Sequence, residues 1–161
     1  MCMICGLDNE YGVNAPFYNM EDGSVMTVFR YKEQHQSYPG RVHGGMITAM
    51  LDEMGLRSLW AKELSEETFG VTISLDTKYR KPVPYETELI GRGVVVKNTS
   101  HFIITDSYIM DKEGEILANG RIKYIKMDTQ KIQEGVEVHE EMPYLVEDGR
   151  TEIEGPFFDN L

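Results

Sequence analysis

The chain has 161 residues, enough for one domain with a buried core, and its 41% hydrophobic and 27% charged residues are ordinary for a globular protein. Its net charge of −11 argues against nucleic-acid binding. The charge is uneven, because residues 128–161 hold ten acidic and two basic residues. We therefore expect a domain at 1–127 followed by an acidic extension at 128–161. No apolar run approaches the ~18 residues of a membrane span, and the first residues do not resemble a secretory signal, so we expect a cytoplasmic protein that does not enter a membrane.

Two cysteines, Cys2 and Cys5, form the one Cys-x-x-Cys pair of the sequence. A structural zinc site requires four ligands, and no second cysteine pair is present. A thioredoxin-like motif would follow a strand of a βαβ unit, whereas this pair stands at the N-terminus. We therefore expect two reduced thiols in a loop, with no metal and no cofactor.

The first strand of any length is predicted at residues 24–32, after a region rich in turn-forming residues in which Phe17 and Tyr18 could begin a shorter strand. Residues 33–42 form a polar loop that ends in the Pro39-Gly40 turn.

The main helix is predicted from Gly44 or Gly45 to about residue 62, with a break at residues 65–67. Apolar side chains surround most of it, which indicates a buried helix; they are Met46, Ile47, Ala49, Met50, Leu51 and Met54. Asp52 is the exception, because a carboxylate on a buried helix is unfavourable unless it is paired or used. Its neighbour Glu53 faces about 100° away and is a weaker candidate.

Four further strands are predicted at residues 69–80, 88–97, 101–110 and 115–127, joined by short turns. In the first of them, alternation places Val71, Ile73, Leu75 and Tyr79 on one face and Thr72 on the other. Gly91 and Gly93 indicate a bulge or a close approach of backbones. One long helix among antiparallel strands predicts an α+β fold in which the sheet wraps around the helix.

The start of the helix could bind a developing negative charge, since a helix N-terminus presents free N–H groups and Gly44 and Gly45 allow close approach. A carboxylate at the same site could activate water or attack an acyl carbon. Asp52 is eight residues beyond Gly44, which is ~12 Å along a helix, so one reacting carbon cannot contact both within one chain. The spacing therefore suggests a site at a two-fold interface, where each helix supplies its N-terminus to one site and Asp52 to the other.

His43-Gly44-Gly45 opening a helix, with an acid nine residues after the histidine, resembles the hotdog-fold acyl-CoA thioesterases of the phenylacetate-pathway and 4-hydroxybenzoyl-CoA type. The resemblance runs from Cys2 to about residue 127 and implies the hotdog fold. It implies that Gly44 polarises the thioester carbonyl, that Asp52 of the partner subunit is the base or nucleophile, and that His43 positions the loop.

Two further positions are compared with the same family. Thr72, seven residues before Tyr79, matches a small hydroxyl residue on the strand after the helix, although alternation places it opposite the apolar face. Ser37 stands six residues before the motif histidine, where relatives often have an asparagine that orients water or the carbonyl.

Lys78, Arg80 and Lys81 form a basic cluster in an acidic protein. The cluster is either a solvated strand end or, together with Gly45 and Ser37, part of a substrate site, because the phosphates of CoA require cationic partners.

The leading hypothesis is an acyl-CoA thioesterase that releases a free acid and CoA without a metal, as a homodimer or a dimer of dimers. The alternatives are a non-catalytic acyl-CoA-binding hotdog protein and a hydratase or dehydratase of related fold. The last is disfavoured because Ser37 occupies the position where that loop would carry a histidine.

Overall fold

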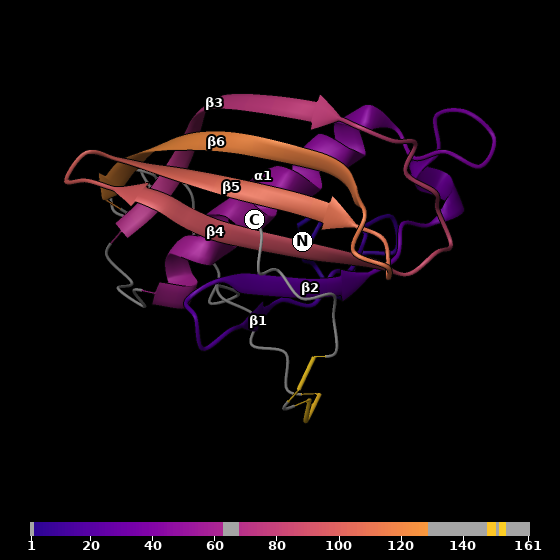
Figure 1. Ribbon diagram of the computed structural model, residues 1–161, viewed down its shortest axis with the longest axis horizontal. Helices are drawn as coiled ribbons and strands as arrows, with labels where there is room; N and C mark the ends of the chain where they lie inside the picture. The colour runs from indigo at the N-terminus through magenta and orange to yellow at the C-terminus, as the bar shows by residue number, and fades with distance from the viewer. Residues whose placement is uncertain (1, 63–67, 129–147, 151, 154–161) are drawn as a thin grey trace.

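A curved antiparallel sheet wraps around one long helix in the computed structural model, which describes residues 2–62, 68–128, 148–150 and 152–153 (Figure 1). The elements in chain order are β1 (Tyr18–Asn19), β2 (Val25–Phe29), the 3-10 helix η1 (Glu33–His35), α1 (Gly44–Lys62), β3 (Thr68–Tyr79), β4 (Leu89–Asn98), β5 (Phe102–Met110) and β6 (Ile116–Asp128). These bounds agree with the predicted helix and strands to within a few residues. Among the described residues, no helix is both long and apolar enough to cross a bilayer.

The six strands are arranged in the order β1-β2-β4-β5-β6-β3, and every neighbouring pair is antiparallel. The chain therefore leaves α1, runs along β3 at one end of the sheet, and crosses to β4 before β5 and β6 fill the middle. One edge of β3 pairs with β6, and the other edge pairs with no described strand. The α+β hotdog prediction is confirmed.

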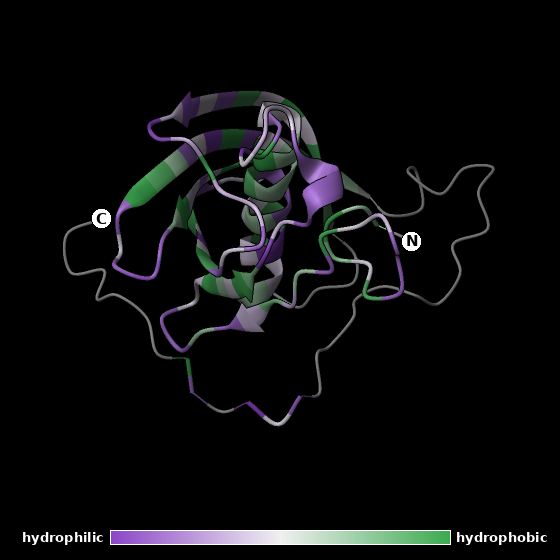
Figure 2. Cartoon of the chain, turned by 90° about the vertical axis from the view of Figure 1, so that its right-hand side faces the viewer, coloured by the Kyte–Doolittle hydropathy of each residue, from purple (hydrophilic) through white to green (hydrophobic). Residues whose placement is uncertain are grey.

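The core lies between α1 and the concave face of the sheet, and the end-on view shows the apolar helix enclosed by the strands (Figure 2). Met50, Leu51 and Met54 are fully buried there. Gly91 and Gly93 of β4 face the helix so closely that a Cβ at residue 93 would lie 2.4 Å from the Met54 carbonyl oxygen. The predicted close approach of backbones is confirmed, and it brings β4 directly against α1.

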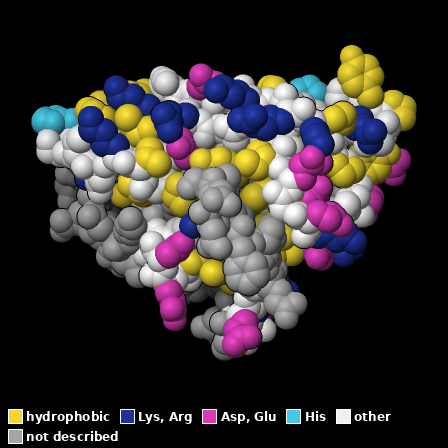
Figure 3. Space-filling model, in the orientation of Figure 1, with side chains coloured by type: hydrophobic (Ala, Val, Ile, Leu, Met, Phe, Trp, Pro, Cys, Tyr) yellow, Lys and Arg dark blue, Asp and Glu magenta, His cyan; other side chains and the backbone are white. Residues whose placement is uncertain are grey.

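The outer face of the sheet has two regions (Figure 3). Lys and Arg side chains gather toward the end of the sheet that β6 and β3 form. An apolar cluster of Met26, Ile90 and Met110 lies on β2, β4 and β5, and Ile153 packs against it.

The alternation predicted for β3 is wrong in its first part, because it places Thr72 opposite the face that Leu75 and Tyr79 share. The register between β3 and β6 shifts between Thr72 and Ser74, which marks a β-bulge. The side chain of Ile73 is 52% exposed, while Thr72 bonds to α1 and Leu75 packs in the core. An inserted residue reverses the faces of all residues after it, so Thr72 and Leu75 share the inner face despite their spacing of three.

Most of the predicted acidic extension at 128–161 lies outside the described residues, as does the predicted helix break at 65–67. Within the short segments that the structure describes, Asp148 accepts a hydrogen bond of 2.7 Å from the Tyr18 hydroxyl. This contact joins the segment to β1.

Candidate active site

His43 caps the N-terminus of α1. Its ring Nδ1 accepts a hydrogen bond of 2.9 Å from the Gly45 N–H, and its carbonyl oxygen accepts from Met46 N–H at 3.0 Å. A Cβ at residue 45 would lie 3.0 Å from Nδ1, so glycine leaves room for the ring to fold over the backbone. The ring itself is exposed. The structure therefore places His43 and Gly45 together as the cap that orients the first turn.

The N–H of Gly44, in contrast, has no acceptor within the part of the chain that the structure describes. Its carbonyl oxygen accepts a hydrogen bond of 3.1 Å from the Tyr79 hydroxyl, which is also 2.6 Å from Thr48 Oγ1. Tyr79 thus fixes the first turn of α1 against the end of β3. The Gly44 N–H remains a free donor at the positive end of the helix dipole, with no side chain of its own to cover it.

A surface depression of about 310 Å³ lies beside this donor. Its lining includes Gly44 and Tyr79 together with the basic residues Arg41, Arg80 and Lys81. Arg80 Nε donates to Asn119 Oδ1 at 2.6 Å, and Lys81 forms an ion pair with Glu115, so both side chains are held in place.

Only part of the predicted basic cluster lines the depression, and a further basic residue joins it there. Lys78 is exposed on β3 and does not line the depression, whereas Arg41 does. The sequence carried a signal for Arg41, since it stands two residues before the motif histidine. Ser37 is exposed, and its side chain makes no hydrogen bond to the described residues; its backbone N–H donates to the Arg41 carbonyl oxygen at 2.9 Å.

Asp52 is half-buried in the middle of α1 and faces β3. Its carboxylate oxygens accept from Thr72 Oγ1 at 2.9 and 3.2 Å, a contact that the β-bulge makes possible. Burial raises the pKa of the Asp52 carboxyl, the hydrogen bond from Thr72 opposes that rise, and the nearby charge of Glu53 adds to it. A carboxylate with a raised pKa and one hydroxyl donor is a suitable general base.

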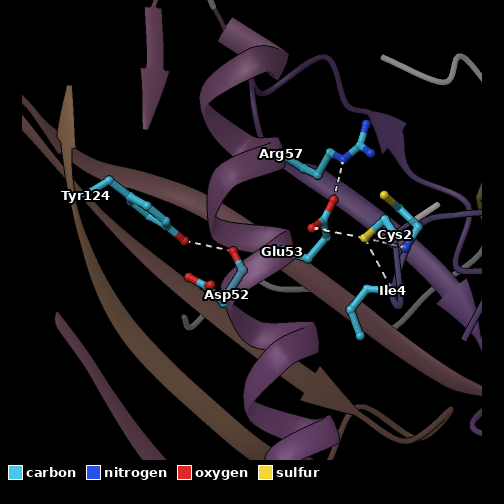
Figure 4. A network of polar contacts seen from close by, with 7 residues as sticks. Cys2, Ile4, Asp52, Glu53, Arg57 and Tyr124 are labelled. Atoms are coloured by element: carbon cyan, nitrogen blue, oxygen red, sulfur yellow. Dashed lines mark hydrogen bonds and ion pairs between the residues drawn. The ribbon is translucent and has the colours of Figure 1, made fainter. Parts of the chain in front are cut away.

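Tyr124 supports Asp52 from behind, and sequence reasoning missed it. Its buried hydroxyl donates to the Asp52 backbone carbonyl oxygen at 2.7 Å (Figure 4). A Cβ at Gly55 would lie 2.3 Å from that hydroxyl, so the glycine makes room for it. Its position on β6 gave no hint of contact with α1, because the interaction is with backbone rather than with a side chain.

Glu53 points away from Asp52, toward the N-terminal loop (Figure 4). Its carboxylate forms an ion pair of 2.9 Å with Arg57 one turn later. Among the described residues it makes no hydrogen bond to Thr72 or Tyr124.

Gly44 and Asp52 therefore lie on one helix, each facing β3. Tyr79 contacts Gly44 near one end of the strand, and Thr72 contacts Asp52 toward the other end. Gly44 and Asp52 are separated by eight residues, or ~12 Å of helix.

Comparisons with known proteins identify the family of this chain. A sequence model of the Thioesterase superfamily matches residues 39–118, which include the His-Gly-Gly motif, Asp52 and Thr72. Acyl-coenzyme A thioesterase 13 of Homo sapiens is 23% identical over 100 residues, or 62% of this chain and 70% of that protein. Acyl-coenzyme A thioesterase THEM4 of Mus musculus is 26% identical over 128 residues, or 78% of this chain and 52% of that protein, so the chain spans about half of its length.

Solved structures show the same fold. The crystal structure of a thioesterase superfamily protein superimposes with a TM-score of 0.69 at 23% identity, covering 76% of this chain and 62% of that one. A hypothetical thioesterase with coenzyme A from Streptococcus pneumoniae has a TM-score of 0.63 at 21% identity, covering 71% and 87%. The chain belongs to the thioesterase superfamily and has the hotdog fold.

Proposed function

We propose that this protein is an acyl-CoA thioesterase whose sites each combine Gly44 of one subunit with Asp52 of another. The observation that carries the proposal is the Gly44 N–H, which has no acceptor among the described residues and lies beside a basic depression, on the same helix as a half-buried carboxylate. Family membership and the named relatives support thioester hydrolysis as the general reaction.

The proposed reaction uses the Gly44 N–H of one subunit and the Asp52 carboxylate of another. The thioester carbonyl oxygen accepts a hydrogen bond from the Gly44 N–H, which stabilises the negative charge that develops on it. Asp52 removes a proton from water as the water attacks the acyl carbon, or its carboxylate attacks that carbon directly. The C–S bond breaks, and the thiolate of CoA leaves and is protonated. On the water route the free acid forms directly; on the route of direct attack, water then hydrolyses the anhydride between the acyl group and Asp52 and releases the acid.

Two observations favour CoA as the carrier. Arg41, Arg80 and Lys81 line the depression next to Gly44, and such cations suit the phosphates of CoA. Two structural neighbours, from Streptococcus pneumoniae and Bacillus halodurans, were crystallised with CoA.

The free edge of β3 supports a shared site. A long strand with an unpaired edge is a template for a second copy. If two copies pair antiparallel about the middle of β3, the Thr72 end of one strand lies beside the Tyr79 end of the other. Asp52 of one subunit then approaches Gly44 of its partner.

The direct test is thiol release from a panel of short-chain, long-chain and aromatic acyl-CoAs. Turnover of at least one ester without added cofactor supports the enzyme. Tight binding of acyl-CoA without turnover would instead indicate a binding protein, and hydration of an enoyl-CoA with the thioester intact would indicate a hydratase.

A mixed dimer tests whether two subunits share each site. A Gly44→Pro subunit and an Asp52→Asn subunit carry different tags, so that only the heterodimer is purified. If sites are shared, one of the two sites is intact and we expect about half of the wild-type rate per dimer. Both homodimeric variants serve as inactive controls, and an inactive heterodimer would contradict the shared site.

Replacing Thr72 with valine is expected to shift the pH profile of kcat/KM. Asp52 acts when ionised, so activity falls as pH drops through its pKa. The Thr72 hydroxyl bonds to the ionised form, so its removal raises the pKa of Asp52 further and moves the acidic limb to higher pH. Thr72→Ser retains the hydroxyl and should restore the wild-type limb; an unchanged limb in the valine variant would exclude this role.

A further inference from the structure

Three potential metal ligands converge beside α1, on the side that Glu53 faces. They are the Sγ atoms of Cys2 and Cys5 and a carboxylate oxygen of Glu53, and all lie within 4.8 Å of one another. Figure 4 shows two of them, Cys2 and Glu53, pointing toward one another and away from Asp52. We propose that Cys2, Cys5 and Glu53 bind a thiophilic divalent cation of the Zn²⁺ type, which joins the N-terminal loop to α1. The site is distinct from the proposed thioesterase chemistry and does not depend on it.

The distances suit a tetrahedral ion. With Zn–S of about 2.3 Å and Zn–O of about 2.0 Å, tetrahedral angles place sulfur and oxygen about 3.5 Å apart. Cys2 Sγ lies 3.8 Å from Glu53 Oε2, so this pair requires an adjustment of only a few tenths of an ångström, and Cys5 Sγ lies within 4.8 Å of the other two ligand atoms. The described residues offer three protein ligands, and water can complete the tetrahedron.

The backbone of the loop is arranged to hold a thiolate. The N–H groups of Ile4 and Cys5 point at Cys2 Sγ, at 3.3 and 3.4 Å. Such donors stabilise a charged sulfur, the form in which cysteine binds metal. The turn requires Gly6, since a Cβ there would lie 2.5 Å from the Cys2 carbonyl oxygen.

Further contacts fix this loop in place. Asn9 Nδ2 donates to the Cys2 carbonyl oxygen at 3.2 Å, and the Val13 and Ala15 N–H groups donate to Met3 and Ile4 at 2.9 Å. The backbone that carries the cysteines is therefore held in one conformation, as a preformed site requires.

Arg57 orients the third ligand and balances its charge. Its Nε lies 2.9 Å from Glu53 Oε1, which leaves Oε2 directed at Cys2. The Arg57 and Glu53 side chains are only 10% and 18% exposed. Arg57 compensates the carboxylate, so two thiolates in this enclosed place would leave two negative charges, which a divalent ion neutralises.

The sequence pattern alone could not suggest this site. Free thiols were expected because only cysteines were considered as ligands. The third ligand, Glu53, comes from a helix 48 residues after Cys5. Only the packing of the loop on α1 reveals the set.

Cobalt titration of the full-length, untagged, reduced protein is the test, because Co²⁺ bound to thiolates gives charge-transfer absorption that Co²⁺ bound to oxygen lacks. We expect saturation at about one Co²⁺ per chain, loss of the band when Zn²⁺ is added, and a Zn²⁺-dependent rise in Tm. The double variant Cys2→Ser, Cys5→Ser should lose the band and the rise.

Glu53→Gln should weaken Co²⁺ binding by about tenfold or more. The matched control is Glu113→Gln, an exposed glutamate on the β5–β6 turn, which should bind as wild type does. The wild-type titration decides the matter even if the cysteine variants fold poorly. Absence of a charge-transfer band in the reduced wild-type protein would overturn the proposal, as would a band of equal strength in the folded double variant. Loss of thioesterase activity would have no bearing on either result.

Discussion

Replacing Asp52 with asparagine is expected to lower the rate of thioester hydrolysis by about 10²- to 10⁴-fold, the usual contribution of a general base. The amide can still accept the hydrogen bond from Thr72, so the local structure should persist. The rate is measured as thiol release from the best acyl-CoA of the panel. Activity close to that of wild type would exclude Asp52 as base or nucleophile.

The same substitution is expected to leave the protein as stable as wild type, or more stable, at neutral pH. Burial raises the pKa of Asp52 above its value in the unfolded chain, so the ionised carboxylate disfavours folding above that pKa. Asparagine removes this penalty, and the difference should disappear in acid, where the carboxyl is neutral. Denaturant unfolding of wild type and variant, at neutral pH and at a pH below the pKa of Asp52, measures this difference in the free energy of unfolding. Asp76→Asn, on the exposed face of β3, is the matched control and should change neither activity nor this pH dependence.

Replacing Gly44 with proline is expected to lower kcat by about 10²- to 10³-fold, the effect of deleting one donor to an oxyanion. Proline has no N–H, and the first position of a helix tolerates it because that N–H has no partner within the helix. A Cβ at this position would lie 3.4 Å from the Tyr79 hydroxyl, an ordinary contact. The folded state should therefore survive, as circular dichroism and Tm can verify.

Gly44→Ala is the control that separates the donor from the space around it. Alanine adds the same Cβ but keeps the N–H, so it should retain most of the activity that proline removes. Equal loss in both variants would mean that substrate access, rather than hydrogen bonding, explains the need for glycine. Equal activity of the proline variant and wild type would exclude the Gly44 N–H from the reaction.

The fold was predictable because its signals are local. The apolar circumference of α1, the alternation of four strands and the Gly91–Gly93 pair each follow from neighbouring residues. The face of Thr72 was not predictable from alternation, since a bulge inserts a residue without any marker in the sequence. The resemblance to known thioesterases nevertheless selected Thr72, because a family motif retains a spacing that a simple period of two does not.

Other parts of the candidate site required the tertiary structure. Arg41 reaches the depression because its loop runs beside β3, and Tyr124 reaches Asp52 from a strand more than 70 residues away. The resemblance anticipated that His43 positions the loop, whereas Gly45 was expected in a substrate site and the structure shows it as the partner of His43 in the cap. A side chain that bonds to a distant backbone group, as Tyr124 does, places no requirement on the residue type of its partner, so the sequence carries no pattern for it.

Tyr124 and Gly55 show how such a contact limits the residue types that the helix can accept. The hydroxyl occupies the place where any side chain at residue 55 would begin, so the spacing between helix and sheet at Asp52 is set by an atom that is missing. Residue 55 takes no part in the proposed reaction, yet any side chain there would displace the Tyr124 hydroxyl. Tolerance to substitution along α1 should therefore follow proximity to Tyr124 as well as proximity to the substrate.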